Sequence, residues 1–71
     1  MQLETLELTA YVLGLIRKEI TTEQLVQALG RNYSLAAAYL QMFDQLKWIE
    51  NKNGKWVLTK LGMINLPRFQ E

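Results

Sequence analysis

The fold of this chain is decided by the stretch from Ile20 to Gly62, ITTEQLVQALGRNYSLAAAYLQMFDQLKWIENKNGKWVLTKLG. Its pattern predicts a helix, a tight turn, a second helix and then a two-stranded hairpin. Thr21 is a favourable N-cap, and Gln24 at the third helical position completes a capping box. Gly30 fits the left-handed residue that ends a helix. The first of these helices is therefore expected over residues 21–29.

A second helix is expected over residues 35–47, after a turn at residues 30–33, with Ser34 as its N-cap. A run of three alanines favours helix here. On a helical wheel the core side holds Ala36, Tyr39, Leu40, Phe43 and Leu46. The opposite side holds Ser34, Ala37, Ala38, Gln41, Asp44 and Gln45, and no Arg or Lys precedes Lys47.

The hairpin is centred on Asn53-Gly54, because both residues accept the positive φ angles of a type I′ turn. Residues 48–50 and 55–58 form its strands, with Ile49, Trp56 and Leu58 directed inward. Thr59 is expected to cap a last short helix that Pro67 ends. Leu61, Met63, Ile64 and Leu66 give that helix its apolar surface. Residues 1–4 and 68–71 are expected to fray.

A further helix is expected over residues 5–19, ahead of a one- or two-residue strand at Ile20. Its core face is predicted to hold Leu8, Tyr11, Val12, Leu15 and Ile16. A second apolar stripe has the three- and four-residue spacing of a short coiled-coil seam, and consists of Leu3, Leu6, Ala10 and Leu13. We interpret the second stripe as a homodimer interface. The alternative is that the N-terminal residues fold back or that Leu6 and Leu13 are exposed.

The order of these elements, the short Asn-Gly hairpin and the closing Leu58-Thr59-x-x-Gly62 resemble the winged helix-turn-helix family. The resemblance covers about two-thirds of the chain. It departs at Lys47-Trp48-Ile49, where the family commonly starts its wing with Gly-Leu-Ile or Gly-Leu-Val. It implies one α+β, mostly helical domain over residues 1–71. Three helices, a small antiparallel β-hairpin wing and a short C-terminal helix make up that fold.

The resemblance also implies binding to double-stranded DNA, with the helix after the turn in the major groove and the wing on the backbone. Carried over by position, the DNA-binding candidates are Arg31, Tyr33, Ser34, Ala38, Gln41, Gln45, Lys52 and Lys55. Glutamine can make two hydrogen bonds to adenine, and alanine can contact a thymine methyl group. Each of these residues also fits an ordinary solvated surface, so both interpretations stay open.

The net charge of +1, from eight basic and seven acidic residues, gives no strong overall attraction to nucleic acid. A monomer offers only three or four usable cations, namely Arg31, Lys52, Lys55 and Lys60, so weak binding is expected. A symmetric dimer would double that number and read two half-sites about one helical turn apart. The alternative is a winged-helix module that binds another protein within a larger assembly, without DNA.

The residue types exclude most other classes. There is no Cys and no His, which removes disulfides, thiolate metal sites, the commonest metal ligand and the commonest general base. There is also no phosphate-binding loop and no cluster of carboxylates. We therefore expect no enzyme activity, metal or cofactor. The start lacks the basic region of a signal peptide, and the apolar runs are too short for a membrane span. The sequence predicts a cytoplasmic protein that regulates transcription or maintains a genome or plasmid.

Overall fold

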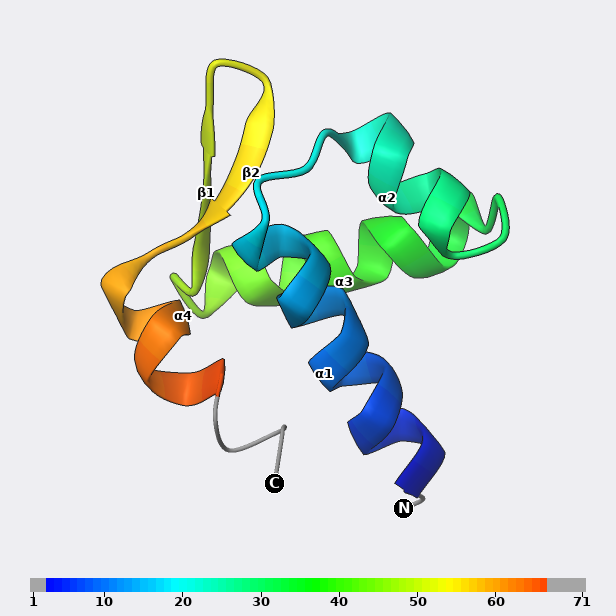
Figure 1. Cartoon of the computed structure of the whole chain (residues 1–71), viewed down its shortest axis with the longest axis horizontal. Coiled ribbons are helices and arrows are strands. Elements are labelled where there is room, and N and C mark those ends of the chain that lie inside the picture. The colour runs from blue at the N-terminus through cyan, green and yellow to red at the C-terminus, as the bar shows by residue number, and fades with distance from the viewer. Residues whose placement is uncertain (1–2, 67–71) are drawn as a thin grey trace.

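The computed structural model of the chain describes residues 3–66, with side chains from residue 7 onward. Within that part the architecture is α+β and mostly helical, with four helices and one two-stranded antiparallel hairpin. The elements follow the order α1 (Leu3–Arg17), α2 (Thr22–Ala28), α3 (Tyr33–Gln45), β1 (Ile49–Lys52), β2 (Lys55–Leu58) and α4 (Lys60–Asn65). In Figure 1, α3 crosses behind α1, and the hairpin rises from the C-terminal end of α3.

The core lies between α1, α2, α3 and the start of β1. Its largest fully buried side chains are Phe43, Leu13, Ile16, Leu25 and Val12. The Phe43 ring stacks on Trp48 with a centroid separation of 5.7 Å, and on its other side meets Tyr39 at 5.6 Å. Aromatic packing therefore joins the middle of α3 to the base of the hairpin.

The rotation of α1 differs from the sequence prediction. Leu13, expected on an outward stripe, is 0% exposed, whereas Tyr11, expected in the core, is 49% exposed. The buried stripe includes Thr9, whose hydroxyl lies 3.2 Å from the Tyr39 hydroxyl in a buried hydrogen bond. Val12 and Ile16 are buried as predicted, and Leu8 and Leu15 are partly buried against the core.

Both ends of α1 also differ from the predicted bounds. The helix begins at Leu3, so residues 3 and 4 belong to it rather than to a frayed end. It ends at Arg17, ahead of the predicted Glu19, because Glu19 takes a left-handed conformation with φ 65°. The other residues predicted to fray, 1–2 and 68–71, lie outside the described residues.

The predicted cap of α2 is confirmed. The Thr21 hydroxyl accepts a hydrogen bond from the Gln24 backbone N–H at 3.1 Å, and the Gln24 side chain accepts from the Thr21 N–H at 3.0 Å. Gly30 has the predicted left-handed conformation with φ 71°. This reciprocal bonding fixes where the helix starts.

Ser34 is not the N-cap of α3. That role belongs to Asn32, whose side-chain oxygen accepts a hydrogen bond from the Leu35 N–H at 3.0 Å, and the helix already starts at Tyr33. The predicted core residues Ala36, Tyr39, Leu40 and Phe43 are buried, but Leu46 is 44% exposed. Leu46 follows the last helical residue, and Lys47 with φ 65° turns the chain away.

The hairpin agrees with its predicted turn. Asn53 and Gly54 have φ angles of 55° and 85°, as a type I′ turn requires. β1 covers Ile49–Lys52, so it starts one residue later than predicted and is one residue longer. The predicted strand residue Ile20 forms an antiparallel bridge with Trp56, through N···O distances of 3.2 and 2.7 Å. The Trp56 indole also donates to the Thr22 hydroxyl at 2.9 Å, so β2 is tied to the start of α2.

The closing Leu58-Thr59-x-x-Gly62 motif locks α4 to the base of the hairpin. The Thr59 hydroxyl accepts from the Gly62 N–H at 3.1 Å and donates to the Lys47 carbonyl at 2.6 Å, confirming Thr59 as a cap. A Cβ at Gly62 would overlap the Trp48 carbonyl oxygen. Leu66 is buried, but Leu61, Met63 and Ile64 are exposed. No helix of the described part is long and apolar enough to cross a bilayer.

Candidate nucleic-acid interface

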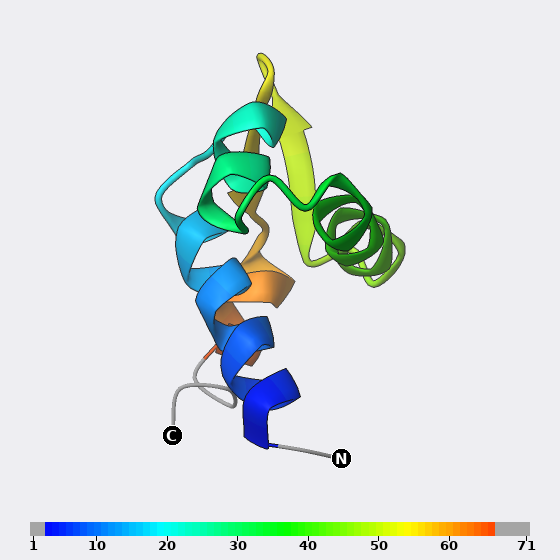
Figure 2. The same cartoon turned by 90° about the vertical axis from the view of Figure 1, so that its right-hand side faces the viewer.

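The outward face of α3 is exposed along its length. Ser34, Ala38, Gln41 and Gln45 are all exposed, at spacings of four, three and four residues that keep them on one side of the helix. Figure 2 shows α3 almost end-on, to the right of α1. This face carries amide, hydroxyl and methyl groups, and Asp44 adds the one charge that α3 contains. It can offer hydrogen bonds to base edges but little attraction to phosphate.

Two further candidates lie at the N-terminal end of α3. Tyr33 is its first residue and is 64% exposed. Arg31 is exposed and left-handed, with φ 64°, and its N–H donates to the Val26 carbonyl at 2.8 Å. Arg31 and Tyr33 therefore lie at the end of α3 where the macrodipole is positive.

The hairpin tip holds the remaining two candidates. Lys52 and Lys55 are directly opposite each other in the antiparallel register, and both are exposed. The Lys52 ammonium lies 3.7 Å from a carboxylate oxygen of Glu50, with side-chain exposures of 66% and 51%. Lys55 has no ion pair within the described residues. Like charges placed opposite each other in a sheet are destabilising, so the tip keeps an unfavourable internal arrangement.

The eight candidates thus form two groups. Six share the outward face and N-terminal end of α3, and two sit at the tip, which projects clear of the helices (Figure 1). The Glu50–Lys52 pair was missed from sequence, although residues two apart in one strand point to the same face. Lys47 was missed as well: it is exposed and lies two residues after the end of α3, which adds a cation near that end of the helix.

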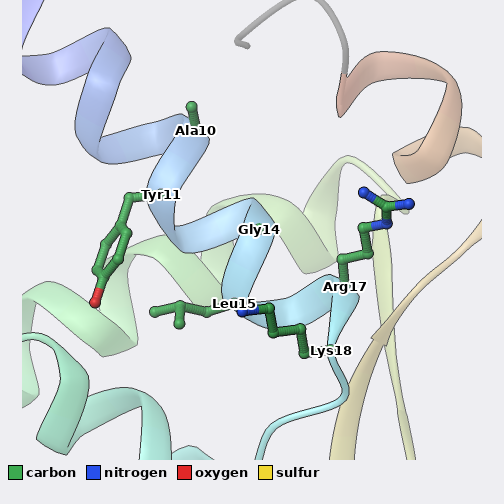
Figure 3. A pocket seen from close by; sticks show the side chains of 6 residues that line it. All are labelled: Ala10, Tyr11, Gly14, Leu15, Arg17 and Lys18. Atoms are coloured by element: carbon green, nitrogen blue, oxygen red, sulfur yellow. The ribbon is translucent and has the colours of Figure 1, made fainter.

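The predicted dimer seam does not form an exposed stripe on α1. Leu13 belongs to the core, Ala10 is half-buried, and the side chains of Leu3 and Leu6 lie outside those that the structure describes. A hollow of about 450 Å³ lies instead on the outward side of α1 (Figure 3). It is lined by Ala10, Tyr11, Gly14, Leu15, Arg17 and Lys18.

A second hollow, of about 310 Å³, lies where α1 meets α3. It is lined by Thr9, Leu35, Ala38, Tyr39 and Met42. Thr9 and Tyr39 each have a hydroxyl group, and the other three side chains are apolar. The described residues contain no group of three or more His, Cys, Asp or Glu that could hold a metal ion. Neither lining includes a carboxylate side chain.

Comparison of the chain with known proteins adds no relative to this picture. No protein-family model matches the chain, and neither a curated protein nor a solved structure gives a match.

Proposed function

We propose that this chain is a winged helix-turn-helix protein that binds double-stranded DNA and serves in transcription regulation or in the maintenance of a genome or plasmid. In this arrangement α2 and α3 are the helix-turn-helix, and β1 and β2 are the wing. The bridge between Ile20 and Trp56 supports it, because it adds a one-residue third strand beside the hairpin.

The observation that carries the proposal is the pair of lysines at the hairpin tip. Lys52 and Lys55 face each other at a cost in stability, and Glu50 reaches only Lys52. A polyanion neutralises both ammonium groups at once, and the tip that carries them projects clear of the helices (Figure 1). DNA phosphates are such a partner, and their neutralisation supplies most of the affinity of DNA-binding proteins.

The α3 face then supplies base contacts. Gln41 and Gln45 are exposed, and each can donate to and accept from adenine in the major groove. Ala38 offers a methyl contact for thymine, and Ser34 a hydroxyl in the first helical turn. Arg31 and Tyr33 contact phosphates at the N-terminal end of the helix. With few cations and Asp44 on α3, a single chain binds weakly, and affinity falls steeply with salt.

The test is a ¹⁵N-HSQC titration with a mixed-sequence duplex at low and at physiological salt. We expect salt-sensitive shifts in residues 31–45 and 52–55. The double variant Lys52→Glu, Lys55→Glu should abolish the shifts while its spectrum stays that of a folded chain. Lys60→Glu is compared with Lys55→Glu alone, because each reverses one charge; Lys60 lies on α4, away from the tip, so its reversal should weaken binding less.

One observation favours a second function, that of a protein-interaction module in a larger assembly. α4 exposes Leu61, Met63 and Ile64, at 45%, 46% and 63%, next to a core that does not use them. Leu61 and Ile64 are three residues apart on α4 and so share a side of it, and a contiguous exposed apolar patch marks a protein-binding surface. A well-folded chain that shows no shifts with duplex at low salt would overturn DNA binding and favour this module.

A further inference from the structure

The outward face of α1 has features that the fold of one chain leaves unused. Glu7, Tyr11 and Gly14 follow one another at spacings of four and three residues, which puts them on one side of the helix. Lys18, the first residue after α1, lines the same hollow as Tyr11 and Gly14. Tyr11 is 49% exposed although it is a large aromatic side chain. Figure 3 shows its ring extending from the edge of the hollow that Gly14 and Lys18 also line.

Gly14 lies within α1, where glycine is less favourable than alanine. The fold of the single chain does not require it, because a Cβ added at Gly14 would meet nothing within 4 Å. The space above Gly14 is therefore open to another molecule, and the lack of a side chain allows that molecule to approach the helix backbone closely.

The charges on this face favour a second copy of α1 as the partner. Glu7 lies near the N-terminal end of α1, and Lys18 lies just beyond the C-terminal end of the helix. Neither side chain has an ion pair within the described residues. A second copy of α1 running antiparallel brings its Lys18 to Glu7 and its Glu7 to Lys18. In the same register Tyr11 of each copy lies over Gly14 of the other. A parallel copy would instead place like charges together.

We propose that the chain forms a symmetric homodimer through an antiparallel pair of α1 helices, with the Tyr11 ring of each copy seated in the hollow over Gly14 of the other. Two ion pairs between Glu7 and Lys18 flank the rings. This contact takes the place of the seam through Leu13. It does not rest on DNA binding. In Figure 3 the hollow lies on α1 with α3 behind it, so this contact also leaves the outward face of α3 uncovered.

The test is the oligomeric state of the protein without DNA, measured by sedimentation equilibrium over a wide concentration range. Glu7→Lys and Lys18→Glu should each weaken the dimer by about tenfold, because each change turns two attractive pairs into repulsive ones. The double variant Glu7→Lys, Lys18→Glu should restore it, since the pairs are re-formed with exchanged signs. A monomer at every concentration, or a dimer that the three variants leave unchanged, would overturn the proposal.

A variant at Gly14 separates the interface from the fold. Gly14→Gln places a long side chain of good helix propensity in the open hollow, so helix content in a dilute monomer should stay equal or rise. The same side chain would exclude the Tyr11 ring of the second copy, and dimerisation should be lost. A folded Gly14→Gln protein that dimerises as the wild type does would show that the hollow is not the contact.

Discussion

At the base of the β-hairpin, Ile49 pairs with Leu58 and is 2% exposed, whereas at the tip Lys52 pairs with Lys55 in contact with solvent. The base is closed by aromatic stacking of Phe43 on Trp48. The tip has one long ion pair, of 3.7 Å, and a like-charge pair. The residue pair at the base of the hairpin is therefore apolar and packed on the core, and the pair at its tip is charged and exposed.

The difference shows which end specifies the fold. At the base, neighbouring atoms cannot move aside for a larger side chain or replace a lost hydrogen bond, because backbone and side chains of α3, β1 and α4 meet there. At the tip, a change in charge alters only what approaches from solvent. Substitutions at the base should therefore lower the free energy of unfolding, and those at the tip should change binding.

The largest effect should come from Gly62→Ala at the base. The added Cβ would overlap the Trp48 carbonyl oxygen and press on the Leu58 side chain, and the backbone cannot yield without moving α4. We expect a loss of about 1–3 kcal/mol in the free energy of unfolding, measured by urea denaturation. Gly14→Ala, also in a helix, is the matched control, because its Cβ meets open space. At high dilution it should stabilise the chain by about 0.5–1 kcal/mol.

A smaller loss is expected for Thr59→Val, which keeps the shape of the side chain but removes its hydroxyl. Both hydroxyl bonds would go, the one accepted from the Gly62 N–H and the one donated to the Lys47 carbonyl. We expect thermal unfolding to show a loss of about 1–2 kcal/mol. Thr59→Ser retains the hydroxyl and should recover most of it. Equal losses in the two variants would mean that the methyl group, and not the cap, holds α4.

Features with partners close in sequence were the predictable part of this fold. The capping box of Thr21 and Gln24, the turn at Asn53-Gly54 and the cap at Thr59 each depend on groups within four residues. Such contacts are visible in the sequence because local geometry alone decides them. The exposed face of α3 was predictable for the same reason, since helical periodicity places Ser34, Ala38, Gln41 and Gln45 together.

The rotation of α1 was not predictable, because it depends on contacts with residues far away in the sequence; Thr9 and Tyr39, which share a buried hydrogen bond, are 30 residues apart. A threonine within an apolar pattern gives no sign that it is buried. The ends of α1 and α3 were misplaced for a different reason. Glu19 and Lys47 take left-handed conformations that glycine usually supplies, so the sequence shows no stop signal there. The hollow on α1 depends on that rotation and was missed with it.

The smallest change in stability, and the sharpest test of the tip, should come from Lys55→Gln. This variant removes one of two like charges that face each other and leaves the Glu50–Lys52 pair in place. The chain should gain up to about 0.5 kcal/mol in stability. Lys52→Gln removes the same repulsion but also the ion pair, so its gain should be smaller. If the tip contacts DNA, either variant should lower the slope of log K against log salt by about 1. A changed stability with an unchanged slope would mean that the lysines only keep the tip solvated, and the difference between base and tip would then lie in burial alone.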